Sequence, residues 1–192
     1  MGKIVVSENV SLDGVVQDPT GEEGFDRGGW FLRISDADRA GWAGAGLEEA
    51  QRGEALLLGR RTEEYLAARW PSRAGAWADR LNGMPKYVVS ATLGEPAWTN
   101  STVLNGDPVT EAAKLKQELA GEIVVAGSIQ LVHALLAHDL VDELRLMVFP
   151  VVVGAGRRMF GETAGALLMR LVSVRAIGDS LAQLTYQRTA GA

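Results

Sequence analysis

Residues 122–137, EIVVAGSIQLVHALLA, contain both halves of an α/β unit. The first part is short, apolar and rich in β-branched residues, which indicates a buried strand at Glu122–Ala126. Gly127 ends that run, and the apolar residues after it predict a helix over Ser128–Ala137. A strand followed directly by a helix is the element from which parallel sheets are built.

The same arrangement occurs earlier, in EALLLGRRTEEYLAA at residues 54–68. It predicts a strand at Glu54–Leu58, a turn at Gly59 and a helix over Arg60–Ala68. A helix that starts directly after a strand directs its free N–H groups and positive dipole end towards the edge where the strand ends. Two such junctions in one sheet predict an anion-binding edge, and Arg60 and Arg61 add positive charge there. The alternative is that each glycine makes a tight turn and the arginines are merely solvated.

The rest of the chain continues the alternation of strands and helices. Ser35, followed three residues later by Asp38, resembles a capping box at the start of a helix. Near the C-terminus the turn Gly178–Ser180 joins two strands directly, which predicts an antiparallel edge. The further predicted strands are Lys3–Ser7, Lys86–Ser90, Thr102–Leu104, Asp142–Val148, Leu168–Ile177 and Ala182–Arg188, and the further helices are Asp36–Arg52 and Val109–Leu119. We expect an α/β fold of three layers in one domain, residues 1–192, with helices on both faces of a mixed, mostly parallel sheet.

Composition excludes several classes of protein. A net charge of −5 and a pI near 5.1 argue against nucleic-acid binding, which needs a basic face. The chain has no cysteine, so disulfides, thiol catalysis and thiolate metal sites are excluded. His133 and His138 are five residues apart, about 140° around one helix, so they do not share a face as metal ligands would. We expect no metal site and no membrane segment, and hence a cytoplasmic protein.

With these elements in order, the chain resembles dihydrofolate reductase and, more closely, the RibD C-terminal family, the reductase domain of bacterial riboflavin biosynthesis. The resemblance covers nearly the whole chain and rests on five blocks of sequence. These are VSENVSLDGVV at 6–16, LLLGRRTEEY at 56–65, KYVVSATL at 86–93, IVVAGSIQLVHALLAHDLVDELRL at 123–146 and FPVVVGAGRRMF at 149–160. The Rossmann fingerprint G-x-G-x-x-G does not follow the first strand.

The resemblance implies an NADPH cofactor and a set of residues that hold it. By position, Gly59, Arg60, Arg61 and Thr62 match the segment at the adenosine-side phosphates, and Ser90 matches a hydroxyl beside the 2′-phosphate. Gly127, Ser128 and Ile129 match the segment at the diphosphate. Ser7, Gly14, Val15 and Val16 match the segment at the nicotinamide. The preference for NADPH over NADH would come from the cationic partners of the 2′-phosphate.

The acceptor is where the sequence departs from dihydrofolate reductase. Alignment back from Gly59 places Ala43 where that family has the acid that binds the pterin. Folate reduction is therefore not expected, and a riboflavin precursor, a ribosylaminopyrimidine phosphate, stays open. Two candidates for a catalytic role are Asp13 and Trp30. The alternative for Asp13 is a turn before Gly14, and the alternative for Trp30 is packing in the core.

The leading hypothesis is an NADPH-dependent reductase acting on a small heteroaromatic or carbonyl acceptor, pterin-like or ribosylaminopyrimidine-like. The alternative is a non-catalytic nucleotide- or flavin-binding protein on the same fold. The partners expected are a small-molecule substrate and a second copy of the chain, with neither nucleic acid nor membrane. The homodimer is expected through the C-terminal strands Leu168–Arg188, which would otherwise expose an apolar edge or face.

Overall fold

The computed structural model describes residues 1–161 and 166–189. Within them, eight strands form one sheet in the order β4-β3-β2-β5-β1-β6-β8-β7. The strands are β1 Lys3–Ser11, β2 Gly53–Gly59, β3 Lys86–Val89, β4 Ser101–Leu104, β5 Glu122–Ala126, β6 Glu143–Phe149, β7 Met169–Ile177 and β8 Leu181–Arg188. The helices are a 3-10 turn η1 Trp30–Arg33, α1 Asp36–Arg52, α2 Arg60–Ala67, α3 Ala76–Gly83, α4 Pro108–Glu118 and α5 Ile129–Ala137. The expected mixed α/β sheet, with helices around it and an antiparallel C-terminal edge, is confirmed.

The chain divides into two compact units, with boundaries inside β1, inside α1 and directly before β6. Unit 1 comprises residues 1–6 and 46–142, and unit 2 comprises residues 7–45 and 143–192. That residues 1–192 act as one domain stays a prediction.

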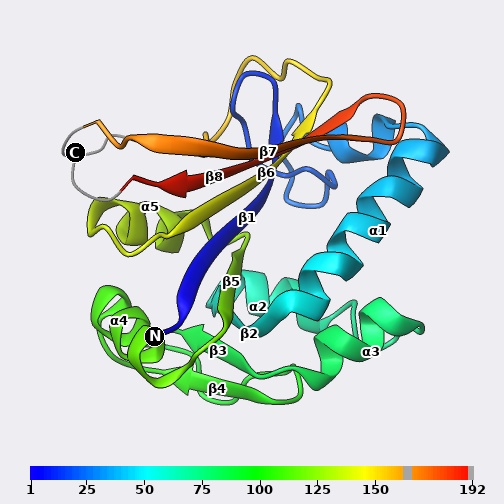
Figure 1. The fold of residues 1–192 in the computed structure, drawn as a ribbon. Helices are drawn as coiled ribbons and strands as arrows, with labels where there is room; N and C mark the ends of the chain where they lie inside the picture. The colour runs from blue at the N-terminus through cyan, green and yellow to red at the C-terminus, as the bar shows by residue number, and fades with distance from the viewer. Residues whose placement is uncertain (162–165, 190–192) are drawn as a thin grey trace. The chain divides into compact units, whose positions relative to one another are not determined.

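Unit 1 contains the parallel half of the sheet. β2 pairs in parallel with β3 on one side and with β5 on the other, and β3 pairs in parallel with β4 (Figure 1). One cluster of its core residues comes from strands, helices and the loops between them: Ala50, Leu56, Leu58, Trp70, Ala78, Leu81, Met84, Trp98 and Val124. The short helix α3 was not predicted, and it supplies Ala78 and Leu81 to this core.

A buried lysine is part of unit 1. Lys86, at the start of β3, is fully buried, and its Nζ donates to the carbonyl oxygens of Asn82, Met84 and Thr99 at 3.1, 2.9 and 2.9 Å. Its Nζ also lies 4.5 Å from the ring centroid of Trp98. Burial lowers the pKa of Lys86 from 10.5 to about 8. The ammonium group thereby ties the end of α3 to the segments on either side of β3 through three backbone carbonyls.

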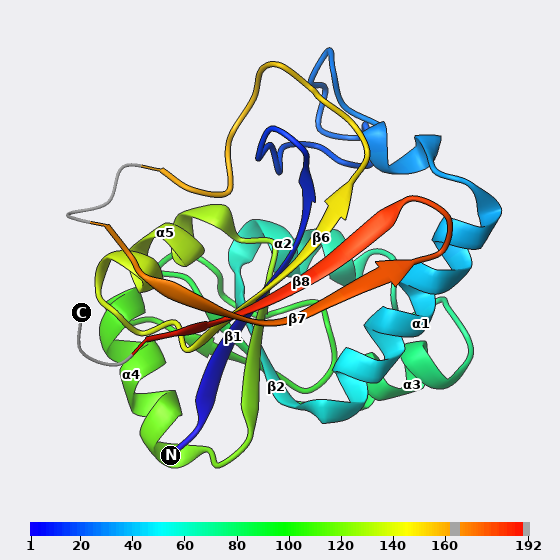
Figure 2. The same cartoon turned by 45° about the horizontal axis from the view of Figure 1, so that its top comes forward.

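Unit 2 contains the antiparallel strands. β8 pairs with β6 on one side and with β7 on the other, so β7 is an edge strand (Figure 2). One cluster of its core consists of Val15, Trp30, Ala45, Met147, Phe149, Val153, Ile177 and Leu181, and the partly buried aromatic residues Phe25, Phe31 and Trp42 pack against it. The turn between β7 and β8 is attached to α1, because the carboxylate of Asp38 accepts hydrogen bonds from Asp179 N, Ser180 N and Ser180 Oγ.

The capping box expected at Ser35 is half correct. Ser35 Oγ accepts the backbone N–H of Asp38 at 3.1 Å, as an N-cap does. The Asp38 carboxylate, however, binds the turn at residues 179–180, and this contact joins two segments that are far apart in the chain.

Candidate functional site

Three of the segments expected to hold a cofactor lie at one edge of unit 1. Gly59 ends β2 and is the register partner of Val89, and Ser90 follows directly. Leu56 of β2 is the register partner of Val124 of β5, so Gly59 and Gly127 lie three residues beyond paired positions. Since parallel strands end at the same edge, Gly59, Ser90 and Gly127 are brought to neighbouring strand ends.

Both helices at this edge start where the strands stop. α2 begins at Arg60, directly after Gly59, and α5 begins at Ile129, two residues after Gly127. In the described part of the chain, neither N-cap residue caps its own helix with a side-chain hydrogen bond. The first N–H groups of both helices therefore lie at the strand ends with the positive ends of the helix dipoles, an arrangement that binds anions.

Ser128 joins the two junctions. Its Oγ accepts the backbone N–H of Gly59 at 2.8 Å and donates to Thr62 Oγ1 at 2.9 Å. Ser128 has φ 58, and the preceding Gly127 has φ 61, so the chain makes a left-handed turn into α5. A Cβ atom on Gly127 would lie 3.0 Å from Thr62 Cγ2, which explains the glycine there. The sequence predicted both junctions but contained no signal for this bridge.

The charge at this edge comes from two exposed arginines at the start of α2. Arg60 Nη1 lies 3.0 Å from Glu64 Oε1, one turn along the same helix, and the two side chains are about equally exposed. Such a pair is weak in water. Arg61 is also exposed, so both guanidinium groups can reach an anionic ligand.

Ser90, which lies at the end of β3, also stabilises the turn that follows this strand. Its Oγ accepts the backbone N–H groups of Thr92 and Leu93 at 3.2 and 3.0 Å, which holds the turn after β3. The Ser90 hydroxyl also lies 3.5 Å from Thr92 Oγ1, and either of the two oxygens can be the donor of that contact.

In unit 2 the expected nicotinamide segment is part of a hydrogen-bonded turn. Ser11 Oγ accepts the N–H of Val15 at 2.8 Å, and Val16 N donates to Arg157 O at 3.0 Å. Gly14 has φ 83, a conformation that favours glycine. Ser7, the other residue expected there, is half-buried in the middle of β1.

Asp13 holds this turn to the segment after β6. Its carboxylate accepts Ser11 Oγ at 2.7 Å and the backbone N–H groups of Val153 and Gly154 at 3.0 and 2.8 Å. These donors, with the Ser11 hydroxyl as the largest contribution, lower the pKa of Asp13 from 3.8 to about 2. The contacts assign Asp13 a structural role, and a role in catalysis stays a prediction.

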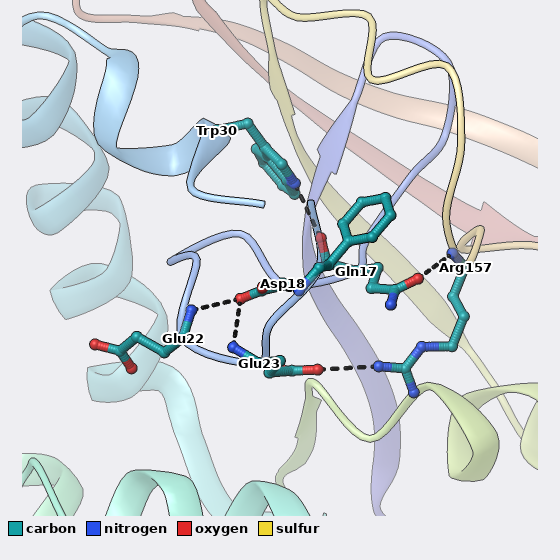
Figure 3. Close-up of polar contacts among 7 residues, drawn as sticks. Gln17, Asp18, Glu22, Glu23, Trp30 and Arg157 are labelled. Atoms are coloured by element: carbon teal, nitrogen blue, oxygen red, sulfur yellow. Dashed lines mark hydrogen bonds and ion pairs between the residues drawn. The ribbon is translucent and has the colours of Figure 1, made fainter. Parts of the chain in front are cut away.

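The loop at residues 17–29 is organised around one buried carboxylate. Asp18 accepts the backbone N–H groups of Glu22, Glu23 and Phe25 at 2.8–3.1 Å (Figure 3). Arg157 contacts the same loop twice, from its backbone N to Gln17 Oε1 and from Nη2 to Glu23 Oε2. The loop thus has a defined internal structure, which its polar, glycine-rich sequence did not indicate.

Trp30 lies at the end of that loop and is 2% exposed. Its Nε1 donates to Gln17 O at 3.0 Å (Figure 3). Its ring packs edge-on against Phe149, with the ring centroids 5.2 Å apart. Trp30 therefore packs in the core of unit 2. Core packing was the alternative that the sequence offered to a catalytic role for this residue.

Neither a metal nor a membrane-spanning element is indicated by the described residues. No three His, Asp or Glu side chains gather there in a way that could hold a metal ion. Among the described helices, none has the length and apolar character required to cross a membrane.

Comparisons with known proteins agree with this architecture. A family model for the RibD C-terminal domain matches residues 2–182. The uncharacterized protein YwjB of Bacillus subtilis is 27% identical over 97% of this chain and 98% of its own. Two solved structures share the fold. A riboflavin biosynthesis protein of Shewanella, named as putative, has a TM-score of 0.70 at 23% identity, covering 97% of this chain and 99% of its own. Dihydrofolate reductase from Enterococcus faecalis, solved with NADP(H), has a TM-score of 0.64 at 14% identity, covering 97% of this chain and 96% of its own.

Proposed function

Because the chain belongs to the RibD C-terminal domain family, we propose that it is an NADPH-dependent reductase that acts on a small heteroaromatic or carbonyl acceptor. The observation that carries this proposal is the edge of unit 1, where two helix N-termini, bridged by Ser128, meet beside two exposed arginines. A dinucleotide needs donors for a diphosphate and, in NADPH, cations for a 2′-phosphate.

The residues at this edge fit those needs. The backbone N–H groups at Gly127, Ser128 and Ile129 would hold the diphosphate, and Arg60, Arg61, Thr62 and Ser90 would hold the 2′-phosphate end. In unit 2, Ser7 and the turn Gly14–Val16 would hold the nicotinamide. When bound, NADPH supplies the hydride. The chain binds and orients the reactants, which can account for a large part of a rate enhancement.

The proton that accompanies the hydride needs a source other than Asp13. With a pKa of about 2, its carboxyl group is ionised at neutral pH and has no proton to give. We therefore propose that water supplies the proton. Folate is not the proposed acceptor, because Ala43 has no carboxylate with which to bind a pterin.

We also propose that the protein works in the cytoplasm as a homodimer formed through the C-terminal strands. The support is the apolar character of edge strand β7, where Leu171, Val172 and Val174 are 48, 45 and 60% exposed. Large apolar side chains grouped on an edge strand favour association with another surface.

The test of the cofactor is a fluorescence titration with NADPH and NADH. We expect the wild type to bind NADPH with a dissociation constant in the micromolar range, on the order of what dinucleotide enzymes need. The double variant Arg60→Ala/Arg61→Ala should bind NADPH about 10- to 100-fold more weakly and NADH about equally well, because two charge-assisted contacts are lost.

A matched control is Arg52→Ala, which removes an exposed arginine from the end of α1 in the same unit and should leave both affinities unchanged. If the wild type binds neither nucleotide, the proposal is wrong. Tight binding of NADPH without its oxidation by pterin, pyrimidine or quinone acceptors would favour a non-catalytic nucleotide-binding protein instead.

A further inference from the structure

The middle of β1 is unusually polar for a strand inside a sheet. β1 lies between β5 and β6 in the strand order, and Ile4, Val5, Val6 and Val10 are buried. The three residues between them, 7–9, are serine, glutamate and asparagine, and all three are half-buried. Internal strands with helices around them are normally apolar throughout, so this interruption marks a place where side chains of the strand can meet a ligand.

Asn9 makes one defined contact with α1. Its Oδ1 accepts the indole N–H of Trp42 at 2.9 Å, and both residues belong to unit 2. An indole nitrogen only donates, so the atom that it meets must be the amide oxygen. The orientation of the Asn9 amide is therefore fixed, with its NH₂ group on the other side. Among the described residues, that NH₂ group has no hydrogen-bond partner.

Aromatic rings accompany this donor. Trp42 packs edge-on against Phe31, with the ring centroids 4.8 Å apart and the planes at 76°. Both rings are half-buried, so part of their surface is accessible. The next residue on α1 is Ala43, which has no polar group to offer. The group of side chains thus combines flat apolar surface with one oriented N–H donor.

We propose that Asn9, Trp42 and Phe31 form the acceptor subsite of the reductase and that it selects flat ring systems that present a carbonyl oxygen to the Asn9 NH₂ group. This inference rests on the proposed function and makes its substrate class specific. A ring with a carbonyl at that edge gains a hydrogen bond, whereas a ring with an amino group there places donor against donor. Two N–H donors that face each other in a partly desolvated site are strongly disfavoured. The subsite therefore distinguishes rings with a carbonyl at this edge from rings with an amino group there.

The experiment uses two ligands with the same ring system and opposite edges. Lumazine carries carbonyl groups at positions 2 and 4 of pteridine, and 2,4-diaminopteridine carries amino groups there. Binding is measured by calorimetry with NADP⁺ present, so that no turnover occurs. We expect the wild type to bind lumazine about tenfold more tightly than the diamino compound, as one hydrogen bond predicts.

Asn9→Asp is the decisive variant, because it keeps an oxygen for the Trp42 N–H and replaces the NH₂ group by a second oxygen. We expect the preference to invert, with the diamino compound binding about tenfold more tightly than lumazine. Trp42→Phe keeps an aromatic ring but no longer fixes the amide, and the preference should shrink to about twofold. Asn105→Asp, an exposed asparagine in unit 1, introduces the same charge and should leave the preference unchanged.

The outcomes separate this inference from the proposed function. If the variants bind NADPH like the wild type but Asn9→Asp keeps the preference for lumazine, the subsite is assigned wrongly and the cofactor proposal stands. The subsite is also wrong if the wild type, with NADP⁺ bound, takes up neither pteridine at millimolar concentration. Failure of the wild type to bind NADPH overturns the proposed function itself. A thermal melt of each variant shows whether it is folded.

Discussion

The side chain of Ser128 stabilises the fold, whereas its backbone conformation is unfavourable for a serine. Its side chain bridges Gly59 and Thr62, while its backbone has φ 58, where a residue with a Cβ is disfavoured. A glycine at this position would relieve the backbone but lose the bridge. The presence of serine indicates that the two hydrogen bonds outweigh the backbone cost, because the hydroxyl is the contact between the two junctions.

A pair of variants separates these two effects. Ser128→Ala loses both hydrogen bonds and keeps the Cβ, so the free energy of unfolding should fall by about 1–3 kcal/mol. Ser128→Gly loses the same bonds but relieves the backbone, and should recover about 1 kcal/mol of that loss. Urea unfolding measures both values, and NADPH titration should show a several-fold weaker affinity in each variant. An alanine variant as stable as the wild type would contradict the role of the bridge.

At the scale of secondary-structure elements, the attachment of α1 to the β7–β8 turn depends on the ionised form of Asp38. The Ser180 hydroxyl first, and then the backbone N–H groups of Ser180 and Asp179, hold the pKa of Asp38 well below its usual value of 3.8, although burial opposes the shift. A carboxyl group whose pKa is lowered by folding stabilises the protein above its unfolded pKa. This contribution is lost as the pH falls from about 4.

Asp38→Asn tests this pH dependence. The amide has one oxygen instead of two and does not ionise, so the variant should be less stable than the wild type at pH 7. As the pH falls from 4 to 2.5, the wild type loses the contribution of Asp38 and the difference in unfolding free energy should shrink. Urea unfolding at several pH values measures it. Asp36→Asn, an exposed neighbour on α1, is the control, and a difference for Asp38→Asn that stays constant with pH would rule out the ionised carboxylate as its cause.

At the scale of the whole molecule, the proposed dimer follows from edge strand β7. We expect the wild type to sediment at twice the 20.5 kDa of one chain. Val174, which is 60% exposed, is replaced by lysine to place a charge on the apolar surface, and the variant should sediment as a monomer. Leu32→Lys changes a leucine that is 56% exposed outside β7 and should leave the dimer intact. A wild type that stays monomeric at high concentration would count against the proposal.

Local sequence patterns predicted most elements because each pattern lies within one element. The bounds of α1, Asp36–Arg52, and of β5, Glu122–Ala126, agree with the structure. β1 was predicted to end at Ser7 but continues to Ser11, because its polar residues 7–9 do not look like a buried strand. α3, Ala76–Gly83, was missed because it is short and ends on a glycine, so its helical periodicity is weak.

The residues of the candidate site could also be predicted only in part from the sequence. Sequence alone determined the two strand–glycine–helix junctions and the arginines beside them, because a strand end, a glycine and a helix start are adjacent in the chain. Tertiary structure decided which of these residues touch. Ser128 reaches Gly59 across 69 positions, and Asp13 reaches Val153 across 140. The hydroxyl of Ser128 and the carboxylate of Asp13 obtain their partners from the pairing of strands, and a local pattern cannot record a hydrogen bond between segments that only folding brings together.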